Sequence, residues 1–187
     1  MKTKGKDYFQ ALYDVARLIN ASLNMATVLE EIVKAVVDAM NVKASSIRLL
    51  DSRRKILMMG AAYGLSKVYI RKGPVIMKES GLDQKALKGD MIWIRDAQTD
   101  PDFQYGAAAK TEGIKSVLVV PLKLGKTVIG FLRVYSDKVR AFNEEERRFL
   151  EAVSNLSAIA IENSRFLKLL ETDYDLLIAH KYRLDDN

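Results

Sequence analysis

Residues 116–135, which read SVLVVPLKLGKTVIGFLRVY, contain two apolar segments on either side of the short connector Lys123–Lys126. Both segments are rich in β-branched and aromatic residues, so the spacing predicts an antiparallel β-hairpin. Each strand is almost continuously apolar, which is typical of central strands that are covered on both faces. Pro121 has no N–H to donate, so we expect it at a bulge or near the end of its strand.

A second hairpin is expected upstream, with strands over 44–51 and 55–63 joined by the polar connector Asp51–Arg54. Residues 66–80 include Gly73 and Pro74 and lack clean periodicity, which predicts a loop. Four short elements are expected between the start of this loop and the central hairpin. They are a strand at Val75–Met77, a helix from Ser80 to Gly89, a strand over 91–94 and a helix over 103–112.

Helical periodicity borders this strand-rich region at both ends. Residues 7–22 predict an amphipathic helix, and residues 24–41 predict a second one with Asn24 as its N-cap and Asn41 as its stop. A long C-terminal helix follows the central hairpin. Together these elements predict an α+β domain, with an antiparallel sheet of about five to six strands, helices packed on one face and long terminal helices.

The C-terminal helix begins at a capping box made by Asn143 and Glu146. From Phe149 to Leu177, apolar positions follow one another in steps of four and three, which is a heptad pattern. At ~1.5 Å per residue this helix outruns the sheet, so its later apolar positions need another partner. A second copy of the same helix is the simplest partner. Alternatively, the helix ends near Arg165 and the tail folds back.

The terminal helices therefore predict a homodimer. Asn163 lies among the apolar heptad positions, where a polar residue would fix the register of two paired helices. The expected interface residues are Phe9, Leu12, Ala16, Ile19, Leu156, Ala160, Asn163, Leu167 and Leu170.

The composition excludes several classes of function. The 187 residues are 49% hydrophobic and 29% charged, which suits one globular domain with a full core. The chain has no cysteine, and a Ser-His-Asp arrangement would need its single histidine, His180, which lies in the tail. A glycine-rich phosphate loop is also missing. We therefore expect no catalytic residues, no cofactor and no metal site.

The net charge of +6 comes from 30 Lys and Arg against 24 Asp and Glu, scattered along the chain. This distribution indicates a solvated surface, so we expect no nucleic-acid partner. No segment approaches the ~20 consecutive apolar residues of a membrane span. We accordingly expect no membrane contact and a cytoplasmic location.

Six short segments occur in the order and the element types of one known family. They are Tyr63–Leu65, Ile92–Asp96, Asp100–Phe103, Gly113–Leu122, Val128–Leu132 and Ala158–Asn163. Over about residues 10–167 the chain resembles the GAF domain family, small sensor modules of bacterial and eukaryotic signalling proteins. PAS domains, the nearest rival, usually lack the paired helices before the first strand. The resemblance implies an N-terminal helix over 1–23, a GAF-like sensor domain over 24–165 and a C-terminal helical extension over 166–187.

The resemblance also implies a pocket for a small molecule between the sheet and the short helices. Carried over by position, its lining residues are Met77, Leu82, Trp93, Ile94, Asp96, Phe103, Tyr105, Ser116 and Leu118. Alternatively, Leu82, Ile94 and Leu118 are plain core residues, and Trp93 is a core aromatic whose N–H is satisfied by the backbone. The GAF subclasses that bind bilins or haem, and the methionine sulfoxide reductases, need Cys or His residues that this domain lacks. Asp137–Lys138, Phe142 and Glu145–Glu146 only echo the signature of the cyclic-nucleotide-binding subclass, with other identities and spacing, so the sequence does not support cyclic nucleotide binding.

Two functions follow as expectations from this resemblance. The first is a small-molecule-sensing regulatory domain, non-catalytic and homodimeric, in which the ligand shifts the packing of the terminal helices. Its output would act on a signalling protein in trans, or the chain is a fragment of a larger bacterial sensor. The alternative is a ligand-free dimerisation or scaffold domain whose pocket is filled by its own side chains.

Overall fold

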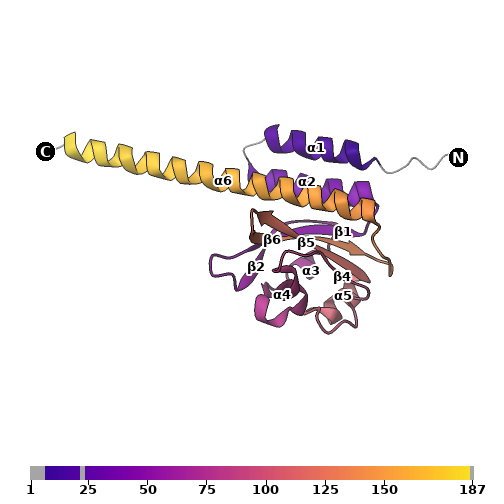
Figure 1. Ribbon diagram of the computed structural model, residues 1–187. Coiled ribbons are helices and arrows are strands. Elements are labelled where there is room, and N and C mark those ends of the chain that lie inside the picture. Colours follow the sequence, from indigo (N-terminus) through magenta and orange to yellow (C-terminus); the bar gives the residue numbers. More distant parts are fainter. Residues whose placement is uncertain (1–6, 22–23, 186–187) are drawn as a thin grey trace.

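The computed structural model describes residues 7–21 and 24–185, with side chains described up to Ile178. Within these residues, six strands form one antiparallel sheet in the order β3-β2-β1-β6-β5-β4 (Figure 1). The strands are β1 (Ala44–Leu50), β2 (Ile56–Tyr63), β3 (Val75–Ile76), β4 (Ile92–Ile94), β5 (Ser116–Leu124) and β6 (Thr127–Ser136). Both predicted hairpins are confirmed, and the β5-β6 hairpin continues through β6 to β1 at the centre of the sheet.

Helices cover both faces of this sheet. One face carries the long helices α2 (Met25–Met40) and α6 (Glu144–Asp185), and α1 (Tyr8–Ala21) packs on these two helices on the side away from the sheet (Figure 1). The opposite face carries the short helices and the loops between them, which we call the second layer (Figure 1). The short helices are α3 (Lys67–Ile70), the 3₁₀ turn η1 (Met77–Glu79), α4 (Gly81–Ala86) and α5 (Gly106–Glu112). The architecture confirms the α+β class, with the long helices gathered on one side.

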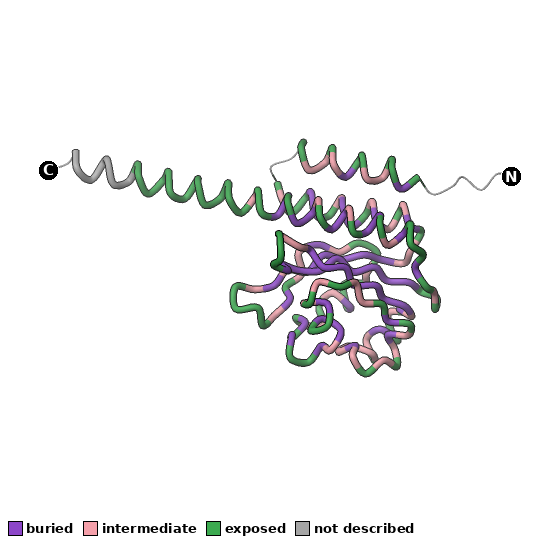
Figure 2. Tube along the Cα trace, in the orientation of Figure 1, coloured by how far each residue is buried: buried purple, intermediate pink, exposed green. Residues whose placement is uncertain are grey.

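Two apolar cores lie on the two faces of the sheet. On β5, Leu118 and Val120 pack with α2 and α6, whereas Val117 and Val119 pack with the second layer. This alternation places consecutive side chains on opposite faces, as the pleat of a strand requires. Figure 2 shows the resulting run of buried residues through the middle of the sheet. The central hairpin is therefore covered on both faces, as predicted.

The caps predicted from the sequence are present. The Asn24 side chain accepts a hydrogen bond from the backbone of α2, and Asn41 ends that helix in the left-handed conformation with φ of 50°. At the start of α6, Asn143 and Glu146 exchange backbone-to-side-chain hydrogen bonds of 3.0 and 2.9 Å. The expected irregularity near Pro121 is a register shift between the next two residues of β5.

Three short elements differ from prediction. Helix α3 lies in a segment expected to be a loop, because a single turn is too short to show apolar periodicity. Helix α5 begins at Gly106 and not at Phe103, since residues 100–103 form a turn in which the backbone N–H of Phe103 donates to Asp100 at 3.2 Å. Helix α4 ends at Ala86, before Gly89.

Gly64 closes β2 where the chain turns towards α3. Its φ is +80°, and a Cβ atom at this position would lie 2.3 Å from the carbonyl oxygen of Lys43. Only glycine can adopt this conformation and also lie so close to the backbone at the start of the neighbouring strand β1. The sequence Tyr63–Leu65 therefore has a steric reason for its glycine.

Helix α1 packs against α6 through Tyr8 and not through Phe9. Tyr8 and Val15 are buried, and the ring of Tyr8 stacks on Phe149 of α6 with centroids 4.8 Å apart. Phe9, one of the expected interface residues, is 80% exposed. Tyr8 takes the buried place because its ring packs in the core while its hydroxyl reaches a polar group at the start of α6.

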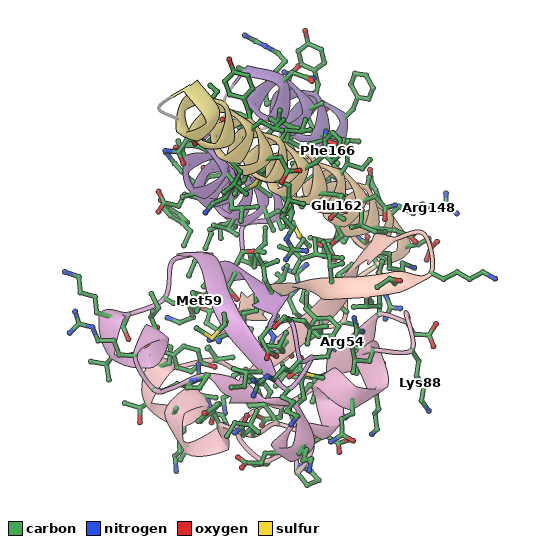
Figure 3. All side chains as sticks on the ribbon, turned by 90° about the vertical axis from the view of Figure 1, so that its left-hand side faces the viewer. Arg54, Met59, Lys88, Arg148, Glu162 and Phe166 are labelled. Atoms are coloured by element: carbon green, nitrogen blue, oxygen red, sulfur yellow. The ribbon has the colours of Figure 1, made fainter. Side chains whose placement is uncertain are left out.

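Helix α6 continues past Arg165 to Asp185, so the alternative of a helix that ends near Arg165 is wrong. Figure 3 shows the layers from the end of this helix, with Glu162 and Phe166 on α6, Met59 in the sheet and Lys88 in the second layer. Within the described part of the chain, no helix combines the length and the apolar composition that crossing a bilayer requires.

Candidate functional site

A group of polar side chains enters the second layer from the two central strands. Ser46 and Arg48 lie on β1, and Arg133 and Tyr135 lie on β6, all at most 3% exposed. Ser46 is opposite Arg133 in the register, so the alternation of each strand directs all four side chains to one face. The hydroxyls of Ser46 and Tyr135 are 2.9 Å apart and share a hydrogen bond. We call these four residues the polar cluster.

Arg133 has a carboxylate partner from α4. Its Nη2 lies 2.5 Å from each of the two carboxylate oxygens of Asp83, which is fully buried. Ser80 caps α4 and also donates to Asp83 at 2.6 Å, which holds the carboxylate in place. Burial lowers the pKa of Arg133, but the attraction of Asp83 outweighs it, so the net shift is upward. Arg133 is thus a charge-compensated guanidinium.

Arg48 has no such partner. Its Nη1 donates to the carbonyl of Leu57 at 3.4 Å, whereas Nε and Nη2 have no hydrogen-bond partner among the described residues. Burial, together with the positive charge of Arg133, holds the pKa of Arg48 below its ordinary value. A buried guanidinium with two unpartnered nitrogens is unfavourable in the domain as it stands. The polar cluster and Asp83 therefore leave one positive charge uncompensated inside the fold.

A groove of about 930 Å³ opens between α3 and α5. Tyr69 lines it, and the same residue is only 2% exposed and meets the ring of Tyr135 edge-on at 6.2 Å. The ring of Tyr69 therefore lies between the groove and the polar cluster. The groove is lined by Lys43, Ser66, Val68, Tyr69, Arg71, Lys72, Ala107, Ala108, Thr111 and Glu112.

Lys72 sits where the groove meets the second layer. Its Nζ lies 3.7 Å from the ring centroid of Tyr69 and 5.0 Å from that of Tyr105, and it donates to the carbonyl of Tyr69 at 3.2 Å. Burial lowers the pKa of Lys72 to about 7, and the positive charges of Arg48 and Arg133 contribute in the same direction. The ammonium group at the base of the groove therefore titrates near neutral pH.

The stability of the domain should rise with pH above about 7 because of Lys72. The pKa of this group is about 7 in the folded chain and 10.5 as its ordinary value, so the unfolded chain binds more protons between these limits. Below pH 7 both states carry the proton and the contribution is flat. Allowing for partial solvent screening, we expect a gain of about 2 kcal/mol from pH 7 to roughly pH 10.

Urea unfolding of the native chain and of Lys72→Met at pH 7 and roughly pH 10 measures this gain. Other titrating groups contribute equally to both proteins, so the difference between their pH dependences isolates Lys72. If the free energy of unfolding changes equally with pH in the two proteins, burial does not disfavour the charged form of Lys72.

Five of the nine predicted pocket residues lie in the second layer. Leu82 and Ile94 are 1% and 3% exposed and are packed core residues, as in the plain-core alternative. Met77 and Phe103 belong to the same core. Tyr105 is partly buried at its edge, and its hydroxyl donates to the carbonyl of Pro74 at 2.8 Å. The ring of Tyr105 lies 5.0 Å from the Nζ of Lys72, although none of the nine predicted residues is among those that line the groove.

The other four lie elsewhere. Trp93 is 38% exposed, and its indole N–H donates to a backbone carbonyl at 3.1 Å. Asp96 accepts from a backbone N–H two residues on, which is turn chemistry, and the hydroxyl of Ser116 donates to a backbone carbonyl at 2.6 Å. Leu118 belongs to the core on the opposite face of the sheet and so cannot line a pocket in the second layer.

The sequence prediction missed the charged groups of this region. Arg133 stands inside a strand that was expected to be almost continuously apolar, and that mismatch was the available signal. Arg48 lies in the other predicted hairpin, for which no buried face was predicted. Asp83 occurs on a short helix where an acidic residue is unremarkable. Tyr69 and Lys72 fall in a segment that was expected to be a loop, where no pattern pointed to them.

The predicted dimer residues divide into two groups. Ala160 is buried, and Leu156, Leu12 and Ile19 pack partly against the core between the long helices, so these side chains serve the fold of one chain. The members that remain exposed are Phe9, Asn163, Leu167 and Leu170. Ala16 is half-buried and belongs to neither group. The side chain of His180, the single histidine, lies outside the described residues.

Comparisons with known proteins add a family to this geometry. A family model described as GAF domain matches residues 22–162. The chain is 24% identical over 164 residues to the formate hydrogenlyase transcriptional activator of Salmonella typhimurium (strain SL1344), covering 85% of this chain and 24% of the relative. It is also 24% identical over 169 residues to a protein of Escherichia coli (strain K12) named for the phosphoenolpyruvate-dependent phosphotransferase system, covering 90% and 22%. The chain thus spans about a quarter of the length of these relatives.

A solved structure supports the same fold. The GAF domain of a phosphoenolpyruvate-protein phosphotransferase from Coxiella burnetii superposes with a TM-score of 0.78, covering 89% of this chain and 99% of that domain. The two chains are 19% identical, so the likeness concerns the backbone. The polar cluster and the groove are properties of this chain's own side chains.

Proposed function

Because this chain belongs to the GAF domain family, we propose that it is a regulatory domain that binds a small molecule between α3, α5 and the sheet. The observation that carries the proposal is the groove of about 930 Å³, which is separated from the polar cluster by the ring of Tyr69. Small-molecule sites are concave and combine apolar walls with a few oriented polar groups. Tyr69 and Lys72 supply both kinds of surface to this groove, and the ring of Tyr105 lies 5.0 Å from the Nζ of Lys72.

The role is regulatory and not catalytic. The chain contains no cysteine, and its one histidine is distant in sequence from the groove residues. The cations of the polar cluster and the groove are suited to holding an anionic ligand. The proposed ligand acts by changing which packing of the domain is populated.

The proposed output runs through α6. This helix packs on the opposite face of β5 and then extends beyond the domain (Figure 1). A ligand that displaces Tyr135 or Arg133 on β6 would also displace the central hairpin, and α6 packs on that hairpin. Two copies that associate through their terminal helices would pass this shift to a signalling protein in trans.

A second candidate is a scaffold domain that binds no ligand. It is favoured by the packing of Tyr69, which fills the space between the groove and the polar cluster with one of the chain's own side chains. Both candidates share the dimer, so only ligand binding separates them.

A thermal-shift screen of the full chain against amino acids, nucleotides, organic acids and neutral sugars tests the proposal. A ligand at 100 times its Kd adds about 2.7 kcal/mol, which for a chain of this size is roughly a 5–10 °C rise in Tm. Tyr105→Ala should abolish the rise, because Tyr105 holds Pro74 and flanks Lys72. Trp93→Ala, which changes an aromatic residue away from the groove, should leave it intact. No saturable shift across the panel would favour the scaffold.

A further inference from the structure

The free nitrogens of Arg48 form one edge of its guanidinium. Nε and Nη2 carry the two parallel N–H bonds on the side away from Nη1, and neither has a partner among the described residues. This edge matches the two oxygens of a carboxylate in a bidentate arrangement. Nη1, which lies outside this edge, is the nitrogen that donates to Leu57. The hydrogen-bonding requirement of Arg48 is therefore for a planar acceptor with two oxygens.

The charge balance favours an anion with a single charge. Asp83 compensates Arg133, and no described carboxylate forms an ion pair with Arg48. Glu112, the acidic residue of the groove, accepts from the backbone N–H and hydroxyl of Ser66 at 2.8 and 2.5 Å and so is engaged with the N-cap residue of α3. One buried positive charge remains, and one carboxylate group neutralises it.

The approach to Arg48 passes through the groove. Lys43, Arg71 and Lys72 outnumber Glu112 along its walls, so the groove attracts anions. Tyr69 stands between the groove and the polar cluster, on a single-turn helix. The segment that carries this helix is bounded by Gly64 and Gly73, with φ of +80° and +115°. A movement of α3 that withdraws Tyr69 would open the way.

The surroundings of Arg48 limit the rest of the ligand. Its cross-strand neighbours on the same face are Phe131 and Met59. A large polar group would lose its hydration there without replacement. Phe131 and Met59 are apolar neighbours that would suit a short carbon chain.

We infer that the ligand is a small monocarboxylate, bound in bidentate fashion by Nε and Nη2 of Arg48 after Tyr69 moves aside. The inference rests on the proposed function and adds the chemical class of the ligand to it. It also explains why an unfavourable buried guanidinium is present, since the ligand supplies the missing partner.

The test uses the full chain and pairs of compounds of equal shape: acetate with acetamide, and propionate with propionamide, at constant ionic strength. The acids should raise Tm in a saturable way, and the amides should leave it unchanged. Arg48→Met should melt several degrees higher than the native chain without ligand and should show no response to the acids. Arg48→Lys keeps the charge without the two-pronged edge, so its affinity should fall at least tenfold.

The outcomes distinguish this inference from the proposed function. If acetamide binds as well as acetate, or if Arg48→Met responds to the acids like the native chain, the carboxylate assignment is wrong. If inorganic phosphate or a neutral compound of the wider panel binds while the monocarboxylates do not, the groove is a ligand site for another class. If no compound raises the Tm of the native chain, both the carboxylate inference and the proposed function are wrong. A gain in Tm for Arg48→Met without any binding by the native chain would point to the scaffold.

Discussion

Replacing Asp83 with Asn should destabilise the domain by about 3–5 kcal/mol, because the substitution leaves the buried guanidinium of Arg133 without its counter-charge. The side chains of the pair are 4% and 0% exposed, so water cannot take over the role of the carboxylate. Asparagine keeps the size of the side chain and one acceptor oxygen. The expected loss therefore reports the charge and not a cavity.

Urea or thermal unfolding of the full chain measures this loss. Asp102→Asn is the matched control, because Asp102 also pairs with a cation, Lys85, but both side chains are well exposed. The control should leave the free energy of unfolding nearly unchanged. If Asp83→Asn were as mild as the control, the pair would not be held away from solvent in the way the structure indicates.

A double replacement tests whether the domain needs the two charges or only the volume of their side chains. Asp83→Leu together with Arg133→Met removes both charges and keeps apolar volume in their place. We expect its free energy of unfolding to lie within about 2 kcal/mol of the native value, since an apolar pair of similar volume often replaces a buried ion pair without loss. A double variant as unstable as Asp83→Asn would show that the charges position α4 on the sheet.

The elements that could be predicted from the sequence are those with a local cause. The caps at Asn24, Asn41 and Asn143 are fixed by side-chain chemistry within three or four residues. The strands of the central hairpin are fixed by composition over a long enough run. Helix α3 has a local cap at Ser66, but a serine alone does not indicate a helix, and one turn contains too few residues to show a period.

The site was harder to predict because a strand that is covered on both faces is apolar at odd and even positions alike. Its sequence therefore does not show which side chains face the site. On β5, Leu118 and Val119 are equally apolar, so no alternation says which of them faces the second layer. A charged residue in such a strand is more informative. Arg133 interrupts β6, and an isolated charge between two apolar cores requires a partner or a ligand. Which partner it meets depends on where the short helix α4, which carries Asp83, packs on the sheet, and that is a matter of tertiary structure.

The same reasoning explains the division of the predicted dimer residues. A heptad pattern identifies one face of α6 but does not say where the domain stops covering that face. Leu156 and Ala160 fall where α1 and α2 still lie alongside. Leu167 lies at the end of this contact, where it lines a small cavity with Ile19 and Met25, and Leu170 lies three residues further on; the two leucines are 45% and 50% exposed. Only the later part of the pattern is available to a second chain.

Leu167→Asp combined with Leu170→Asp should convert the proposed homodimer into monomers. Burial of each leucine against a second helix is worth about 1.5–3 kcal/mol, and four such side chains meet in a symmetric pair. We expect the dissociation constant to rise by a factor of at least roughly a thousand. Light scattering should then give a mass of 21.1 kDa in place of twice that value.

Thr172→Asp is the matched control, because Thr172 is exposed on the same helix and lies on the side away from the leucines in the heptad pattern. It should leave the mass of the dimer unchanged. Both leucines are exposed in the single chain, so the double variant should keep the folded domain and its ligand response at a concentration where it is monomeric. A monomeric native chain, or a double variant of unchanged mass, would contradict an interface at Leu167 and Leu170. A monomer that lost its fold as well would mean that these leucines stabilise the domain itself, which their exposure argues against.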